Sequence, residues 1–203
     1  ITVNGQIIKK ADCKIDENAD KIVCQNTPVT YRKYAYYMLN KPAGVVSATI
    51  DNTADTVISL LNGVTDKDLF PVGRLDKDTT GLLLITNDGE LSHRLLSPRK
   101  HVDKQYLVGL RSPLAPDHIA QLEEGVDIGD DSKTLPAKVE VLSELQIILT
   151  IHEGRFHQVK RMLKAVDNEV LSLQRISFGP LTLDPTLNEG QFRELTAEEI
   201  KLL

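Results

Sequence analysis

The segment GRLDKDTTGLLLITNDG, residues 73–89, joins a loop of charged residues to a short apolar run, LLLIT at 82–86. An apolar run of this length between Thr-Gly and Asn-Asp-Gly is typical of a buried strand. Downstream, ELSHRLLS at 90–97 is followed by Pro98, which is a stop signal for a helix. The segment therefore predicts a loop, a buried strand and a short helix, in that order.

The rest of the chain interleaves strand and helix patterns irregularly. The stretch YAYYMLNKPAGVVSA, residues 34–48, indicates two strands around a Lys-Pro-Ala-Gly turn. This order predicts an α+β fold whose mostly antiparallel mixed sheet is flanked by helices. Further strands are expected at KQYLVGL (104–110), VEVLS (139–143) and LQIILTI (145–151), and helices at PDHIAQLEEGV (116–126), ended by Gly125, and at RFHQVKRMLKAV (155–166).

The predicted helix at 155–166 is expected to have two different faces. Apolar residues recur there at helical spacing, at Phe156, Val159, Leu163 and Val166. This pattern predicts one face in the core and a basic face opposite, which in most helices is simply solvated. The preceding EGR, however, brings a strand end, a glycine and a helix N-terminus together, and free backbone N–H groups at such a place favour a phosphate.

Residues 1–30 are expected to form a small unit of their own. Asn4-Gly5, between short apolar runs in ITVNGQIIKK, is the strongest short-range signal for a hairpin. The unit is too small for an independent core, and TPVTYRK at 27–33 has the proline and the polar residues of a linker. We therefore expect two domains, 1–30 and 31–203.

Composition favours a soluble, cytoplasmic protein without cofactors. The 203 residues are 41% hydrophobic, which is enough for one core, and no apolar run reaches the roughly 18 residues of a membrane span. Cys13 and Cys24 have no partners at metal-ligand spacing, so we expect reduced thiols and no metal site. The sequence has no phosphate-binding loop, dinucleotide glycine motif or nucleophile elbow, so no nucleotide cofactor is indicated.

The formal net charge of −5 argues against a nucleic-acid partner only as an average. Acidic residues gather in LEEGVDIGDD and ELTAEEI, away from the basic ones. A net acidic chain with local basic surfaces can still bind RNA. The basic residues form two stretches, one with Arg94, Arg99, Lys100, Lys104 and Arg111, the other with Arg155, Lys160, Arg161 and Lys164.

Asp76 has three interpretations on the residues alone. In an extended loop, Arg74, Asp76 and Asp78 project to the same side, which places a basic group beside a carboxylate. A loop aspartate most often makes an Asx turn or a helix cap. Asp76 and Asp78 also fit a glycoside hydrolase pair, whose carboxylates lie roughly 5 to 9.5 Å apart. By default, Tyr106 is a core tyrosine and Lys41, in its Pro-Gly turn, is solvated.

Four motifs in the right order resemble the RsuA-type pseudouridine synthases, which modify ribosomal RNA. MLNKPAGVVSA resembles the first motif, GRLDKDTTGLLLITNDGELSHRLLSPR the catalytic motif, KQYLV the tyrosine-bearing strand, and EGRFHQVKRMLKAV with RISFGPLTL the C-terminal motifs. The likeness covers nearly the whole chain and implies the pseudouridine synthase fold for residues 31–203. Residues 1–30 resemble the second half of the S-four-like RNA-binding domain that these enzymes carry in front.

The resemblance also implies roles for individual residues. Asp76 matches the essential carboxylate that acts when the uridine glycosidic bond breaks and uracil rejoins through carbon 5. Tyr106 matches the aromatic residue that packs on the flipped uracil, and Lys160 matches the cation paired with the aspartate. No metal or organic cofactor is implied. With the basic stretches included, the candidates for RNA binding are Arg74, Arg94, Lys100, Lys104, Arg155, His157, Gln158, Val159 and Arg161.

The motifs resemble most the branch that acts on a single uridine of small-subunit 16S rRNA. The expected partner is therefore 16S rRNA or a small-subunit assembly intermediate, and the expected state is a monomer. A 23S rRNA target is the alternative within the family. A non-catalytic ribosome-assembly factor built on the same fold is the alternative from another class, and the intact Asp76, Tyr106 and Lys160 speak against it.

Overall fold

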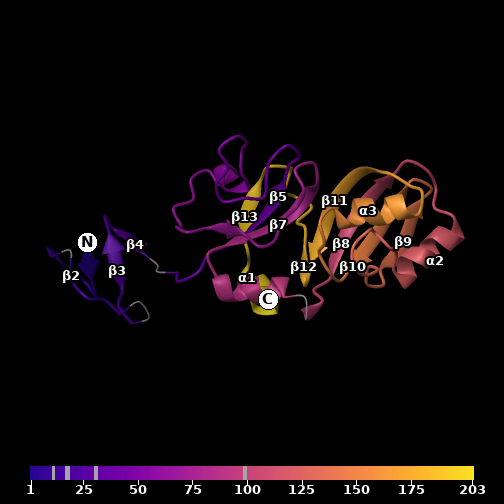
Figure 1. Ribbon diagram of the computed structural model, residues 1–203. Helices are drawn as coiled ribbons and strands as arrows, with labels where there is room; N and C mark the ends of the chain where they lie inside the picture. The colour runs from indigo at the N-terminus through magenta and orange to yellow at the C-terminus, as the bar shows by residue number, and fades with distance from the viewer. Residues whose placement is uncertain (11, 17–18, 30–31, 98–99) are drawn as a thin grey trace. The chain divides into compact units, whose positions relative to one another are not determined.

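A computed structural model of the chain describes residues 1–10, 12–16, 19–29, 32–97 and 100–203 (Figure 1). They form two compact units, Ile1–Tyr34 and Ala35–Leu203. Pro98 and Arg99, a predicted helix stop and a predicted basic residue, lie outside the described residues. Within the described ranges, every helix is too short or too polar to cross a lipid bilayer.

The first unit contains a four-stranded antiparallel sheet in the order β2-β1-β3-β4. β1 (Thr2–Val3) and β2 (Gln6–Ile7) form the hairpin predicted at Asn4-Gly5, whose φ angles of 49° and 81° suit a type I′ turn. β3 (Ile22–Cys24) pairs with β4 (Thr27–Val29), so the segment expected as a linker begins as a strand. Pro28 is tolerated there because β4 is an edge strand.

The second unit is built on a nine-stranded mixed sheet in the order β13-β5-β7-β11-β8-β10-β9, with β6 paired to β7 and β12 to β11. β7 and β11 run parallel, and the other pairings between its named strands are antiparallel in the described residues. The predicted α+β fold with a mostly antiparallel mixed sheet is confirmed. The strands are β5 (Tyr36–Lys41), β6 (Phe70–Pro71), β7 (Thr80–Thr86), β8 (Lys104–Leu110), β9 (Lys138–Ser143), β10 (Gln146–Ile151), β11 (Val170–Phe178), β12 (Leu181–Thr182) and β13 (Phe192–Glu194).

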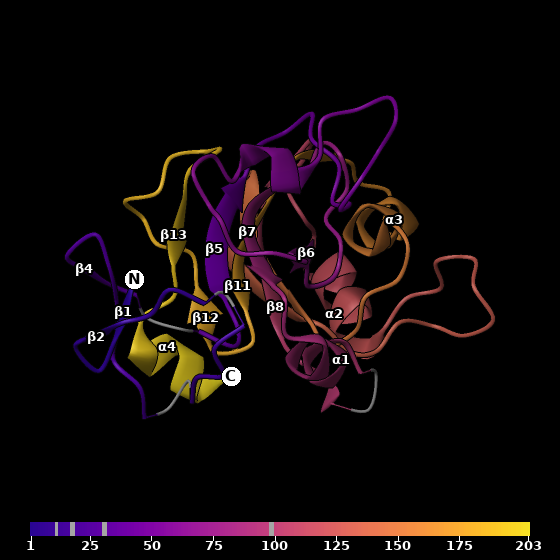
Figure 2. The same cartoon turned by 90° about the vertical axis from the view of Figure 1, so that its left-hand side faces the viewer.

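Helices flank this sheet, and Figure 2 shows α3 and α4 on opposite sides of it. α1 begins where the Asp88 carboxylate accepts a hydrogen bond from the N–H of Leu91. α2 begins with Pro116 and ends at Gly125, as predicted, because the φ of Gly125 is 95°. The helical segments are η1 (Val57–Leu60), α1 (Gly89–Leu96), α2 (Pro116–Glu124), α3 (Gln158–Ala165) and α4 (Ala197–Leu202).

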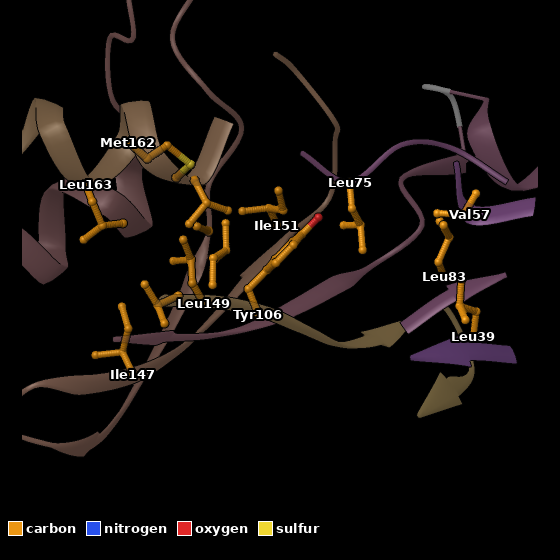
Figure 3. Packing of buried hydrophobic residues seen from close by; sticks show 14 of the residues in the cluster. Leu39, Val57, Leu75, Leu83, Tyr106, Ile147, Leu149, Ile151, Met162 and Leu163 are labelled. Atoms are coloured by element: carbon orange, nitrogen blue, oxygen red, sulfur yellow. The ribbon is translucent and has the colours of Figure 1, made fainter. Parts of the chain in front are cut away.

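Both faces of the central strand β7 are buried, because successive side chains point to opposite faces of a sheet. Leu83 and Ile85 belong to one core cluster, whereas Leu82 and Leu84 belong to a second. The first cluster, shown in Figure 3, joins Tyr106 of β8 to the apolar side of α3, and the second lies against α1. A continuous apolar run such as LLLIT is what a strand covered on both faces requires.

Three local predictions are wrong. The second strand expected in residues 34–48 is absent, and the structure there has an isolated bridge between Val46 and Thr56. Phe156 is 75% exposed rather than in the core, because α3 begins at Gln158 and the helical period does not extend back to Phe156. Lys41 is fully buried rather than solvated, because carbonyl groups of a distant turn accept its hydrogen bonds.

Candidate active site

Asp76 lies in the turn between β6 and β7, and the backbone on both sides of it is fixed. On one side, the Ser47 hydroxyl accepts from the N–H of Leu75 at 3.0 Å and donates to the Leu75 carbonyl at 2.9 Å. On the other side, the N–H of Thr79 donates to the Asp76 carbonyl at 3.1 Å. The position of the Asp76 backbone is therefore set by local hydrogen bonds.

Lys41 anchors the same turn from the end of β5. Its ammonium group donates to the carbonyl oxygens of Pro42, Lys77 and Thr79 at 2.9, 3.3 and 2.9 Å. Burial lowers the pKa of Lys41 to about 8, and the neighbouring carboxylates, first among them that of Asp78, oppose this shift. The side chain thus links a central strand to the turn that carries Asp76, a role that sequence reasoning missed.

The carboxylate of Asp76 faces α3. Its Oδ2 lies 3.2 Å from the Lys160 ammonium and its Oδ1 lies 3.6 Å from Nε2 of His157. The Asp76 side chain is 27% exposed, so the pair is accessible to a ligand. The carboxylate thus meets the cation predicted for it instead of closing an Asx turn on its own backbone.

Lys160 is shared between two carboxylates. Its ammonium lies 2.5 Å from Oδ1 of Asp78, whose side chain is 73% exposed. Partial burial lowers the pKa of Lys160, but the hydrogen bonds to Asp78 and Asp76 outweigh this effect and raise it overall. The hydrogen bond from Lys160 is also the largest cause of the lowered pKa of Asp78. Lys160 therefore remains a cation beside Asp76 at neutral pH.

Tyr106 approaches the same region from the sheet. Its ring is 7% exposed, and Figure 3 shows its hydroxyl directed toward Leu75, the residue before Asp76. Behind it lies Arg175 of β11, which is 2% exposed and donates from Nε to the Leu82 carbonyl at 2.8 Å. Burial lowers the pKa of Arg175, and the neighbouring Tyr106 opposes that shift. Arg175 is a second buried cation that sequence reasoning did not single out.

His157 marks the start of α3 and has a left-handed backbone, with φ 49°. Its ring stacks on that of Phe156, with the ring centroids 3.8 Å apart and an interplanar angle of 17°. A non-glycine residue in this conformation is uncommon and persists only where the surroundings impose it. The conformation brings the His157 ring to Asp76 while Phe156 stays outside the core.

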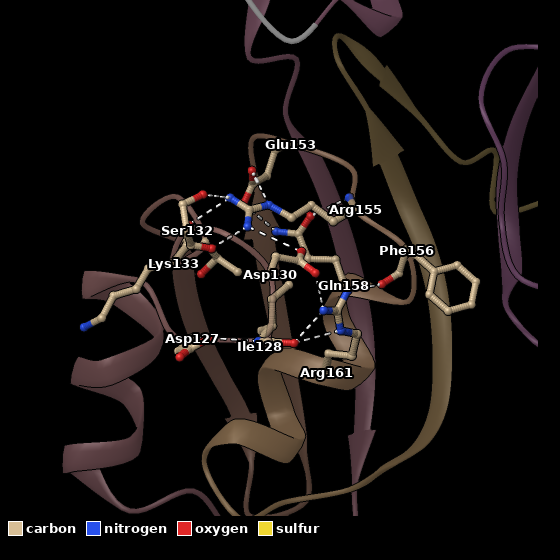
Figure 4. Close-up of polar contacts among 12 residues, drawn as sticks. Asp127, Ile128, Asp130, Ser132, Lys133, Glu153, Arg155, Phe156, Gln158 and Arg161 are labelled. Carbon is tan, nitrogen blue, oxygen red and sulfur yellow. Dashed lines mark hydrogen bonds and ion pairs between the residues drawn. The ribbon is translucent and has the colours of Figure 1, made fainter.

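Arg155 holds the loop before α3, as Figure 4 shows. Its Nε donates to Glu153 at 2.9 Å, and its terminal nitrogens donate to the carbonyls of Ser132 and Lys133 at 2.7 and 2.8 Å. Gln158 closes the loop, since its Oε1 accepts from the Arg155 N–H at 2.9 Å. The polar groups of these two RNA-binding candidates are thus engaged within the protein.

Arg161 is engaged in the same network (Figure 4). Its Nε donates to the carbonyl of Ile128 at 3.0 Å, and another nitrogen donates to the carbonyl of Phe156 at 3.0 Å. It also pairs with Asp130. Its guanidinium group therefore ties α3 both to the loop before it and to the segment around residue 128.

The other RNA-binding candidates are distributed more widely. Arg74 is exposed and makes no ion pair within the part of the chain that the structure describes. Val159 is 4% exposed and belongs to the core cluster of Figure 3. The structure does not bring the remaining three to Asp76. Arg94 donates to the Leu203 carbonyl, Lys100 and Arg94 line a surface hollow beside α4, and Lys104 packs over the Phe178 ring of the second cluster.

Metal ligation has no support among the described residues, where no three His, Cys, Asp or Glu side chains are grouped to hold an ion. The arrangement instead offers an accessible carboxylate between two nitrogen groups, and the Tyr106 hydroxyl is directed toward the preceding residue, Leu75 (Figure 3). Such a group acts as a nucleophile or as an acid–base catalyst.

A family model described as RNA pseudouridylate synthase matches residues 35–165, which include Asp76, Tyr106 and Lys160. The chain belongs to this family. The family predicted from the four motifs is confirmed, and its members are enzymes. The second unit therefore has the pseudouridine synthase fold.

Relatives within the family match over almost their full length. The chain is 48% identical to "Uncharacterized RNA pseudouridine synthase YtzG" of Bacillus subtilis, with 100% of this chain and 87% of the relative covered. It is 45% identical to the ribosomal small subunit pseudouridine synthase A of Escherichia coli K12 and 43% identical to that of Vibrio cholerae, with 98% of this chain and 87% of each relative covered.

Solved structures agree with this assignment. A crystal structure of a pseudouridylate synthase is similar with a TM-score of 0.80 at 40% identity, over 100% of this chain and 88% of that one. An archaeal box H/ACA sRNP Nop10–Cbf5 complex is similar with a TM-score of 0.55 at 17% identity, over 78% of this chain and 52% of that one. At that identity the likeness extends to the fold alone.

Proposed function

We propose that this pseudouridine synthase isomerises one uridine of small-subunit 16S rRNA, with Asp76 as the essential carboxylate. The observation that carries the proposal is the placement of Asp76 between Lys160 at 3.2 Å and His157 at 3.6 Å. The rRNA target is supported by the 45% identity to the ribosomal small subunit pseudouridine synthase A of Escherichia coli.

The reaction breaks the bond from the ribose to N1 of uracil and forms one to carbon 5, and a proton moves from carbon 5 to N1. Asp76 acts at the bond that breaks, and the Lys160 cation stabilises its negative charge. Tyr106 packs on the uracil and is the group suited to take the carbon 5 proton. Atoms and charges balance without a redox partner or an activated water.

The uridine must leave its stack to reach Asp76. Base extrusion costs a few kcal/mol, which contacts between protein and RNA have to offset. Arg74, exposed and two residues before Asp76, is the residue we assign to hold the RNA there. Arg94 and Lys100, which line a surface hollow, extend phosphate contacts away from the turn that carries Asp76. Lys104 is partly buried and donates to the Val102 carbonyl at 2.7 Å, so we assign it a positioning role in RNA binding. We assign residues 1–30 as a partial S-four-like RNA-binding module.

Arg155, Gln158 and Arg161 contribute to RNA binding through the shape of the loop before α3. Their polar atoms hold backbone groups at residues 128, 132, 133 and 156 in place. We therefore assign them a positioning role. The protein acts as a monomer on 16S rRNA or on a small-subunit assembly intermediate.

The experiment that tests this function is pseudouridine mapping by carbodiimide labelling and primer extension. It uses 16S and 23S rRNA from cells that lack the gene, with complementation by the natural protein, by Asp76→Asn or by Asp78→Asn. We expect one lost 16S site, restored by the natural protein and by Asp78→Asn but not by Asp76→Asn. Asp78 is the matched control because it pairs with the same lysine, and a glycoside hydrolase pair would require both carboxylates.

The outcomes separate the alternatives. A lost site in 23S rRNA overturns the 16S assignment and leaves the reaction intact. Loss of no site overturns the synthase activity in favour of a binding-only assembly factor. Restoration by Asp76→Asn overturns the role of that carboxylate.

A further inference from the structure

The Phe156 ring is presented to solvent at the edge of the candidate active site. Phe156 is 75% exposed, and aromatic residues are scarce in this chain, at 4% of its residues. One face of the ring is covered by His157, whose centroid lies 3.8 Å away at an interplanar angle of 17°. With one face covered, the observed exposure must come from the opposite face and the ring edge.

The backbone that carries this ring is held on both sides. Arg161 donates to the Phe156 carbonyl at 3.0 Å, and the preceding Arg155 is bound through its N–H to Gln158 at 2.9 Å. Figure 4 shows Phe156 projecting from this polar network rather than into it. The exposed position is therefore built into the loop, and the ring is presented at little cost in ordering.

The surroundings of the ring point to a nucleic-acid base. His157, which stacks on Phe156, lies 3.6 Å from Asp76, so the open face of Phe156 is one ring removed from the catalytic carboxylate. Lys160, which pairs with the same carboxylate at 3.2 Å, follows on the same helix. A flat, exposed aromatic ring held at the edge of such a site matches the platforms on which proteins stack unpaired bases.

We propose that Phe156 and His157 form a stacking platform for the RNA base next to the target uridine. The inference rests on the proposed function and adds a subsite to it. Extrusion of the uridine removes a stacking neighbour from the adjacent base, and the open face of Phe156 replaces that neighbour. The platform thus offsets part of the cost of base extrusion and is tolerant of base identity, because every base has a π face.

The test uses the absence of tryptophan from the chain. Phe156→Trp places a single indole at the platform, whose fluorescence reports stacking directly during titration with 16S and 23S rRNA transcripts. The same proteins are assayed for tritium release from transcripts made with uridine tritiated at carbon 5. Phe156→Ala removes the platform, and Leu171→Ala is the control because Leu171 is 63% exposed in β11.

We expect strong quenching of the indole by RNA and near-natural binding by Phe156→Trp. Phe156→Ala should lose about 10-fold or more in RNA affinity, the usual effect of removing one stacking partner, while Leu171→Ala binds as the natural protein does. An unquenched indole, or RNA affinity of Phe156→Ala within about twofold of the natural protein, overturns the platform. Absence of tritium release by the natural protein, both from the free transcripts and from small-subunit assembly particles that contain the same tritiated 16S rRNA, overturns the proposed function instead. The fluorescence result still decides the stacking.

Discussion

Replacement of Lys41 by methionine should change how the stability of this protein depends on pH. The ammonium group is 0% exposed and its pKa falls from 10.5 to about 8 because of burial. At about 1.4 kcal/mol for each tenfold change in proton affinity, the protonated side chain costs the folded state roughly 3 kcal/mol at pH 7. This cost is present below pH 8 and disappears as the pH rises to 10.5, because between these values the unfolded chain binds the extra proton.

The natural protein should therefore gain roughly 2 kcal/mol in free energy of unfolding from Lys41 between pH 7 and pH 10. Lys41→Met has no proton to lose at this position and should lack that gain. Lys104, whose pKa is also lowered to about 8 by burial, titrates in both proteins and cancels in the difference. Urea unfolding at pH 7 and pH 10, followed by far-ultraviolet circular dichroism, measures the free energy of unfolding of both proteins and therefore this difference.

Methionine also leaves three backbone carbonyls without their donor, those of Lys77 and Thr79 in the turn that carries Asp76 and that of Pro42. Each buried acceptor that loses its partner costs about 1–3 kcal/mol, so the turn should loosen and pseudouridine formation should fall. Parallel changes in stability of the two proteins between pH 7 and pH 10, together with unchanged turnover, would refute the role assigned to Lys41.

Three further predictions concern the site and the sheet. Lys160→Met should abolish turnover and raise the pKa of Asp78 toward its ordinary value, because the hydrogen bond from Lys160 is the main cause of the lowered Asp78 pKa. Carboxyl carbon NMR measures this titration, and an unchanged Asp78 pKa in the variant contradicts the pairing. Gly81→Ala should lower the free energy of unfolding by about 3 kcal/mol or more, because φ at residue 81 is +101° and a Cβ there would lie 2.3 Å from the Arg175 carbonyl oxygen. The control is Gly89→Ala, which has open space around the new Cβ and should melt near the temperature of the natural protein. RNA affinity should fall steeply with salt if several phosphates are contacted, and a flat dependence counts against the basic residues assigned to RNA.

The central architecture was predictable because its signals are local. The apolar run at 82–86 and the alternation at 104–110 became β7 and β8, and Gly125 ended α2 as predicted. The Asn4-Gly5 hairpin formed for the same reason, since its turn needs positive φ and these two residues tolerate it. Hydrophobic periodicity and the residue types of turns depend on residues close together in the sequence, so both can be read from the sequence directly.

The sequence by itself determined the sheet class, the family and the identity of the candidate catalytic carboxylate. Tertiary structure alone decided which charged side chains are solvated and which are fixed. Lys41 is buried because carbonyls 36 and 38 residues away accept hydrogen bonds from its ammonium group, and Arg161 is engaged by a carbonyl 33 residues away. The physical reason is that a side chain is solvated, paired or buried according to partners brought by distant segments, and local pattern carries no information about those partners.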